Sequence, residues 1–199
     1  MKGLEYLHDM SVMHGNLTPS NVLVNLAGDA IVSDFSLSKS LLTESPIFTQ
    51  SNGPSGSFRY MPPEIYGTAP LTTQADVYSW GMTALEIITG RTYPCYPIRQ
   101  TLISFRVDLP HYLIKSAGGV VIAVQGGQMP RRENYDSGGE ISDRIWNLLA
   151  SCWDIPGNRP TVERVLDVLA TEREERTQWR REVDPSPRPQ MENDWPSAF

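Results

Sequence analysis

The polar stretch HGNLTPSN, residues 14–21, is followed directly by VLV at residues 22–24, a short run of the residue types that favour β-strands. A second such run, AIV at residues 30–32, comes after Ala-Gly-Asp at residues 27–29, which are typical of a turn. A second polar stretch, SDFS at residues 33–36, follows it. The pattern predicts a β-hairpin flanked by two polar clusters, and these clusters are the first candidates for a functional site.

Helical periodicity governs much of the remaining chain. Leu4 and Leu7 stand at helical spacing before the first polar cluster, so we expect a helix there. The strongest pattern predicts a core helix over about residues 74–89, with Thr72 or Thr73 as its N-cap. One apolar stripe of this helix holds Val77, Gly81, Leu85 and Ile88.

Two further helices are predicted, over residues 141–153 and 162–170. Residues 43–57 are rich in Ser, Thr, Gly and Pro, a composition that predicts a mobile loop. Residues 101–117 show no clean period and contain Pro110, which blocks a continuous helix. Two explanations of this last segment stay open: an added surface loop, or a gene-model artefact.

The composition predicts one folded domain and a polar tail. The chain has 199 residues, of which 40% are hydrophobic and 20% are charged, an ordinary balance for a globular protein. After residue 170 the sequence is dense in charge and then in proline. We therefore expect a domain over residues 1–170, and over residues 171–199 a charged helical extension followed by a disordered Pro-rich tail.

Charge and cysteine content exclude several kinds of partner. Lys and Arg number 17 against 23 Asp and Glu, a net charge of −6, so the chain lacks the basic footprint of a nucleic-acid-binding protein. The two cysteines lack metal-site spacing, which favours a reduced, cytoplasmic protein. No apolar run approaches the ~20 residues that span a bilayer, so no membrane contact is expected.

Short motifs follow one another in a fixed order: His14-Gly15-Asn16-Leu17 with Asn21, Asp34-Phe35-Ser36, Pro62-Pro63-Glu64, and Asn158-Arg159-Pro160-Thr161. The first three resemble the protein-kinase motifs H-R-D-x-x-x-x-N, D-F-G and A-P-E. Residues 56–64, GSFRYMPPE, resemble G-T-x-x-Y-M-A-P-E of the serine/threonine or tyrosine-kinase-like branch. The resemblance covers about residues 1–170 and implies a mainly α fold, a protein-kinase-like C-terminal lobe with a short β-hairpin.

The resemblance also implies roles for individual residues. Asn21 and Asp34 match the family's Mg²⁺ ligands, which act together with the phosphates of ATP. His14 would pack beneath Phe35 in a hydrophobic spine and carry no chemistry. The remaining structural roles fall to Asp76, which would hold the catalytic-loop backbone, and to Glu64 and Arg159, which would form a buried ion pair.

Departures from the family pattern argue against catalysis. Asn16 stands where the family has the Asp that accepts the substrate hydroxyl proton, and an amide cannot take up that proton at neutral pH. Gly15 and Thr18 replace an Arg and a Lys, and Ser36 replaces the Gly of D-F-G. No G-x-G-x-x-G occurs, and Lys2 is the only lysine before His14, so the N-lobe is expected to be missing and ATP and Mg²⁺ to go unbound.

Three functional classes therefore stay open. The chain is an incomplete serine/threonine-like protein kinase, a pseudokinase that serves as a binding or scaffold module, or a truncated product without a function of its own. The first two imply a protein substrate or a protein partner. The sequence does not specify that protein, the choice between Ser/Thr and Tyr, or the oligomeric state.

Overall fold

The computed structural model describes residues 1–35, 38–41, 57–68, 72–89, 117–136, 139 and 141–183. The predicted mobile loop lies outside these residues except for Ser57, and so does the segment 101–117 except for Ala117. Ser36 and the tail beyond Val183 also lie outside them.

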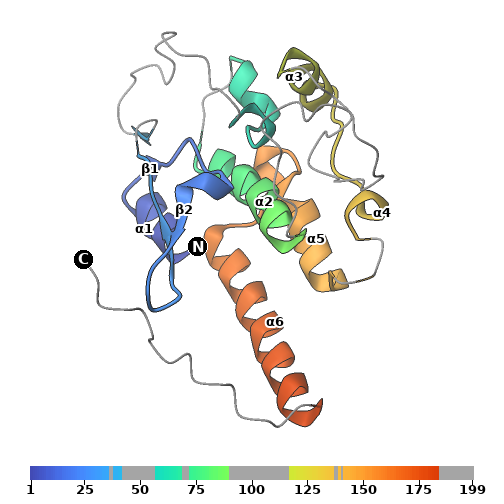
Figure 1. Cartoon of the computed structure of the whole chain (residues 1–199). Coiled ribbons are helices and arrows are strands. Elements are labelled where there is room, and N and C mark those ends of the chain that lie inside the picture. Colours follow the sequence, from blue (N-terminus) through green and yellow to red (C-terminus); the bar gives the residue numbers. More distant parts are fainter. Residues whose placement is uncertain are drawn as a thin grey trace, which may run out of the picture.

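The N-terminal third forms a helix and two small antiparallel sheets (Figure 1). Helix α1 spans Lys2–Asp9, and strand β1 (Val12–Met13) pairs with β4 (Lys39–Ser40). After a 3₁₀ turn at Pro19–Asn21, strands β2 (Val22–Val24) and β3 (Ala30–Val32) pair in the register Val22 to Val32. The predicted hairpin is confirmed, and its turn places Gly28 at φ 85°, a backbone conformation that favours glycine.

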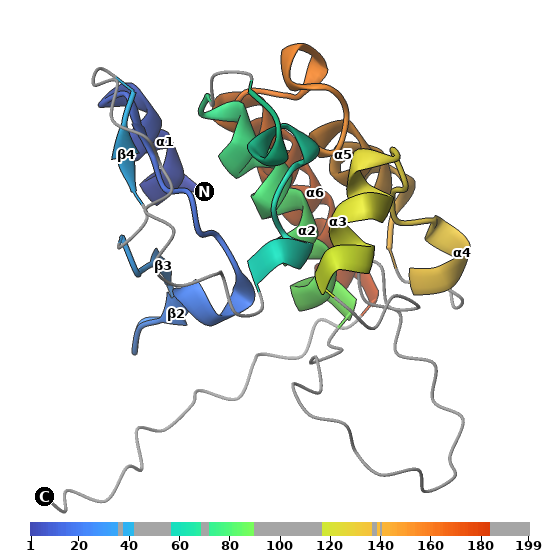
Figure 2. The same cartoon turned by 90° about the horizontal axis from the view of Figure 1, so that it is seen from above.

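Helices make up the rest of the described chain (Figure 2). Their bounds are α2 Gln74–Thr89, α3 Ala117–Gln125, α4 Arg132–Tyr135, α5 Asp143–Cys152 and α6 Val162–Val183, with 3₁₀ turns at Ser57–Arg59, Pro63–Tyr66 and Pro156–Asn158. Helix α2 has the predicted bounds, and the Thr72 hydroxyl accepts a hydrogen bond from its first amide, at 3.3 Å from Gln74 N. The mainly α fold class with a short hairpin is thereby confirmed.

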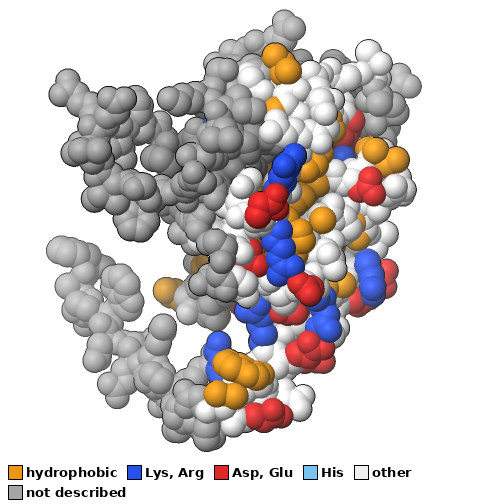
Figure 3. Space-filling model, turned by 90° about the vertical axis from the view of Figure 1, so that its right-hand side faces the viewer, with side chains coloured by type: hydrophobic (Ala, Val, Ile, Leu, Met, Phe, Trp, Pro, Cys, Tyr) orange, Lys and Arg blue, Asp and Glu red, His pale blue; other side chains and the backbone are white. Residues whose placement is uncertain are grey.

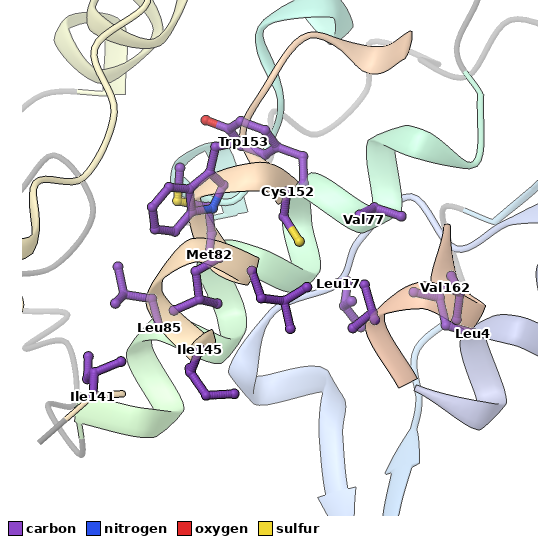
Figure 4. Close-up of a cluster of buried hydrophobic side chains, with 14 of the residues drawn as sticks. Leu4, Leu17, Val77, Met82, Leu85, Ile141, Ile145, Cys152, Trp153 and Val162 are labelled. Atoms are coloured by element: carbon purple, nitrogen blue, oxygen red, sulfur yellow. The ribbon is translucent and has the colours of Figure 1, made fainter. Parts of the chain in front are cut away.

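The core lies between α2, α5 and the start of α6, and Leu4 of α1, Leu17, Tyr135 of α4 and Ile141 also belong to it (Figure 4). The predicted stripe of α2 is buried at Val77, Gly81 and Leu85, whereas Ile88, in the last turn, is 46% exposed because the buried cluster does not reach that turn. Burial raises the pKa of the Cys152 thiol to about 12. Burying these apolar side chains supplies the main driving force for folding.

Helix α6 continues past residue 170 to Val183, within the segment for which a charged helical extension is predicted, and it extends below the other helices in Figure 1. Neither Gly nor Pro occurs in Val162–Val183, and Glu172 receives hydrogen bonds from Arg176 at 2.8 Å and from Ser142 of the α5 cap at 2.9 Å. Figure 3 shows the face at the right of Figure 1, where Lys and Arg side chains lie interspersed with Asp and Glu side chains and with hydrophobic ones. No helix within the described residues is long and apolar enough to cross a membrane.

Gly81 of α2 packs tightly against the C-terminal end of α5. A Cβ added there would lie 2.7 Å from Trp153 Nε1 and 2.8 Å from Cys152 Cβ, so the two helices would have to separate. We expect Gly81→Ala to destabilise the protein by about 1–3 kcal/mol through overpacking. Thermal unfolding would show this as a loss of several degrees.

Gly157→Ala is the matched control, because a Cβ at Gly157 would meet nothing within 4 Å. This variant should melt within about 1 °C of the parent chain. A Gly81→Ala variant that is as stable as the Gly157→Ala variant would contradict the tight packing of α2 on α5.

Candidate functional site

The two polar clusters predicted around the hairpin meet at its base. The Asn16 side-chain amide donates a hydrogen bond to Asp34 Oδ2 at 3.0 Å, and the Asn21 amide lies 3.4 Å from the same oxygen. Asn21 also donates to the backbone carbonyl of Asn16 at 2.7 Å. The hairpin explains this convergence, because its register continues past Val22 and Val32 and brings Asn21 opposite Ser33, whose amide donates to the Asn21 carbonyl at 2.9 Å.

Asp34 has an unusual backbone conformation. Its φ is 63°, in the left-handed region that few residues other than glycine adopt and that Asp tolerates better than most. The residue is exposed, so burial does not hold its side chain in place. The side-chain amides of Asn16 and Asn21, which contact its Oδ2 atom, therefore help to orient this carboxylate.

Asp76, at the start of α2, holds the loop that carries Asn16. Its carboxylate is 1% exposed and accepts hydrogen bonds from His14 N at 2.8 Å and Gly15 N at 2.9 Å. The His8 ring lies 2.9 Å from the same carboxylate. Gly15 turns the chain here at φ 77°, a backbone conformation that favours glycine.

His14 is fully buried and both of its ring nitrogens are engaged. Its Nε2 atom lies 3.0 Å from the Ser33 carbonyl, so Nε2 carries the proton, and Nδ1 accepts from Asn16 N at 3.2 Å. The ring contacts Phe35 edge-on, with centroids 5.3 Å apart, although Phe35 is 52% exposed. His14 is therefore a structural residue in this arrangement.

The buried ion pair of Glu64 with Arg159 is present. Arg159 Nη1 and Nη2 donate to the two Glu64 carboxylate oxygens at 2.5 and 2.9 Å, and the Arg159 side chain is fully buried. Arg159 also donates to the backbone carbonyls of Asp154 and Gln74 and lies over the ring of Tyr78. Burial raises the pKa of Tyr78, so its phenol stays neutral.

A further polar contact was missed by sequence reasoning. Tyr60 donates a hydrogen bond to Glu86 at 2.5 Å, joining the segment before Pro62 to α2. Burial raises the pKa of Glu86, while the bond from Tyr60 and the charge of Arg59 oppose that rise. A signal was available, since Glu86 is the only charged residue of α2 after Asp76.

One oxygen of Asp34 is engaged by amide nitrogens of Asn16 and Asn21, so this oxygen is not open to a cation in this arrangement. The cation needs oxygen ligands, and protein sites supply one or two carboxylates alongside the nucleotide phosphates. Here two amide nitrogens point at Asp34 Oδ2, and Asn16 has no carboxylate to offer. The nitrogen assignment of Asn21 is set by its contact with the Asn16 carbonyl, because a carbonyl oxygen can only accept.

Comparison with known families accounts for this geometry. The family model "Protein tyrosine and serine/threonine kinase" matches residues 1–169. The match includes the hairpin, the loop anchored by Asp76 and the pair formed by Glu64 and Arg159. The chain belongs to the protein kinase family.

Curated relatives agree with this assignment. A G-type lectin S-receptor-like serine/threonine-protein kinase of Arabidopsis thaliana is 40% identical over 185 residues, which cover 84% of this chain and 21% of the relative. Serine/threonine-protein kinase STY17 of the same plant is 27% identical over 169 residues, covering 84% and 25%. A third Arabidopsis relative, named "Probably inactive leucine-rich repeat receptor-like protein kinase", is 29% identical over 172 residues, covering 84% and 16%. The chain thus spans 16% to 25% of the length of these three relatives.

Proposed function

We propose that this chain is a serine/threonine-like member of the protein kinase family that does not itself transfer phosphate. The observation that carries the proposal is the Asn16 amide, which occupies the position of the family's catalytic Asp and donates to Asp34 at 3.0 Å. A cytoplasmic location and a protein partner are part of the proposal. The location rests on the two cysteines, whose spacing is not that of a metal site and favours a reduced protein. The partner rests on the family's use of protein substrates.

The chemistry of Asn16 supports the proposal. Proton removal from a substrate hydroxyl by a positioned base contributes ~10²–10⁴-fold to the rate, equivalent to about 3–5 kcal/mol of barrier. A side-chain amide that already donates its N–H to a carboxylate cannot accept that proton. His14 cannot serve as a substitute base, because both of its ring nitrogens are occupied by Ser33 and Asn16.

Phosphotransfer by the purified chain is the direct test. We expect neither the parent chain nor Asn16→Asp to phosphorylate a generic protein substrate with radiolabelled ATP and Mg²⁺. Restoring the carboxylate supplies the base but neither the Gly-rich loop nor the strand Lys that position the phosphates. An active, complete serine/threonine kinase assayed alongside serves as the positive control. ATP-dependent labelling above background by the parent chain would contradict the proposed function, and labelling gained by Asn16→Asp would show that this chain can position ATP.

A second candidate, a protein-binding module, is favoured by the outer face of the hairpin. Leu23 and Ile31 lie directly opposite each other in the register of β2 and β3 and are 55% and 48% exposed. Adjacent exposed apolar side chains of this kind occur at protein-interaction sites. Proteins that bind to the parent chain but not to a double variant carrying Leu23→Ser and Ile31→Ser would support this function. Identical binding to the two chains would contradict it.

A further inference from the structure

We propose that the last two turns of α6 form a docking site for an amphipathic helix of a partner protein. The site consists of Trp179 and Val183, with Arg180 on one flank and Glu182 on the other. It lies beyond residue 169, where the match to the family model ends. The inference goes beyond the proposed function, because it depends neither on Asn16 nor on the hairpin.

Exposure increases along one face of α6. Residues seven positions apart lie close to the same face of an α-helix. At this spacing Val165 is fully buried, Glu172 is 9% exposed and Trp179 is 62% exposed. Val183 stands one turn beyond Trp179 and is also 62% exposed. The face that packs on the core therefore continues, with two apolar side chains, into the part of α6 that extends past the other helices (Figure 1).

Charges repeat at the same seven-residue spacing on the two flanks of this face. Glu175 and Glu182 directly precede residues of the face and lie on one flank. Arg173 and Arg180 directly follow residues of the face and lie on the other flank. In pairs of packed helices, charges at such flanking positions select the partner and its orientation. The end of α6 thus presents two apolar side chains between an acidic and a basic flank.

Helix α5 covers the acidic flank at Glu175 but not at Glu182. Its Arg144 lies 2.5 Å from Glu175 and 3.6 Å from Glu172. The N-cap of α5, Ser142, also donates a hydrogen bond to Glu172 at 2.9 Å. Because α5 starts at this level of α6, it does not extend along the last two turns (Figure 1).

The described part of the chain supplies no counterpart of Arg144 at the last two turns. No ion pair among the described residues involves Arg180 or Glu182. Glu182 accepts a hydrogen bond at 3.1 Å from Gln178, a neutral residue of its own helix. A basic side chain opposite Glu182 therefore has to come from the partner.

These features define the chemistry of the partner. It needs apolar side chains one helical turn apart to pack on Trp179 and Val183, and it needs a basic and an acidic residue for the two flanks. An amphipathic helix whose apolar stripe lies between a basic and an acidic flank meets these needs. Tryptophan and arginine are also among the residue types that contribute most at protein interfaces.

A second copy of α6 meets these needs less well. In an antiparallel pair of α6 helices the two acidic flanks would face each other, and so would the two basic flanks. In a parallel pair the two folded cores would compete for the same space, because the core covers this same face at Val162 and Val165. The occupant is therefore a helix of another protein.

Fluorescence anisotropy of a labelled three-heptad peptide, titrated with the full 199-residue chain, tests the proposal. The peptide carries leucines along one helical stripe, lysines on one flank and glutamates on the other, and a comparison peptide carries glutamates on both flanks. The first peptide should bind at least about tenfold more tightly, because one flank of the second faces Glu175 and Glu182. Equal affinity for the two peptides, or no saturable binding of the first below about 1 mM, would overturn the proposal.

Two variants place the binding on α6. Trp179→Ser combined with Val183→Ser should weaken binding of the first peptide at least about tenfold, because the apolar contact is lost. Ile155→Ser is the matched control, since Ile155 is 66% exposed but lies in the connection between α5 and α6, and it should leave the affinity unchanged. Both variants change exposed side chains, so they should melt within about 2 °C of the parent. Equal weakening by the two variants would contradict a site on α6.

Sedimentation of the chain without peptide distinguishes a partner helix from a second copy. We expect a monomer at micromolar concentrations. A dimer that dissociates when Trp179→Ser and Val183→Ser are introduced would identify a second copy as the occupant and overturn the proposal. None of these measurements involves phosphotransfer, so failure here and failure of the proposed function are separate outcomes.

Discussion

Arg159→Ala should leave the protein largely unfolded. The substitution strands Glu64 without its partner and also removes the donors to the Gln74 and Asp154 carbonyls. Breaking one side of a buried ion pair costs about 3–5 kcal/mol, a large part of the ~5–15 kcal/mol that stabilises a typical domain. The measurement is a thermal or urea melt followed by circular dichroism, in which we expect the cooperative transition of the parent to be absent or to fall by at least about 10 °C.

Arg144→Ala is the control for this variant. Arg144 pairs with Glu175 at 2.5 Å and lies 3.6 Å from Glu172, but its side chain is 39% exposed and that of Glu175 is 58% exposed, and such surface pairs contribute little to stability. Its melting temperature should stay within about 3 °C of the parent. Equal melting temperatures for the Arg159 and Arg144 variants would contradict a buried, structure-determining pair.

Asp76→Ala is expected to have the second largest effect. The carboxylate accepts from the His14 and Gly15 amides, and its removal leaves two donors without an acceptor in a largely buried place. Each such group costs about 1–3 kcal/mol, so the summed loss is about 2–6 kcal/mol. Amide hydrogen exchange provides the local readout, because protection at residues 14–16 should disappear even under conditions in which the helices remain folded.

Asp76→Asn separates this role from simple packing. The amide keeps the size of the carboxylate and retains one acceptor oxygen, so protection at one of the two backbone amides should survive. Asp143, which is 85% exposed, offers a control position where alanine should not alter exchange at residues 14–16. Unchanged protection in Asp76→Ala would mean that another group holds the loop.

Local signals in the sequence were sufficient for the elements that depend on near neighbours. The hairpin follows from two β-type runs and a turn containing Gly28, and α2 follows from its apolar stripe and its threonine cap. Helix α6 runs without a break through residue 170, so the predicted helix over residues 162–170 and the start of the predicted charged helical extension form one helix. The boundary of the domain at residue 170 stays a prediction.

Contacts between distant residues needed more than the pattern. Glu64 and Arg159 are 95 residues apart, and only the family resemblance connected them before the structure showed their ion pair. The bond from Asn16 to Asp34 was not foreseen, because the loss of a base was inferred from residue type while the direction of an amide depends on the folded loop. Tyr60 and Glu86 were missed for the same reason.

Calorimetric titration of the 199-residue chain with ATP, in the presence and absence of Mg²⁺, tests the central claim most directly. One oxygen of Asp34 is already engaged by the Asn16 and Asn21 amides, and the sequence contains no Gly-rich loop, so we expect no saturable binding below about 100 μM, a free energy of roughly −5.5 kcal/mol. Magnesium should make no difference to this result. Binding of ATP that saturates below about 100 μM, requires Mg²⁺ and is abolished by Asp34→Asn would contradict it.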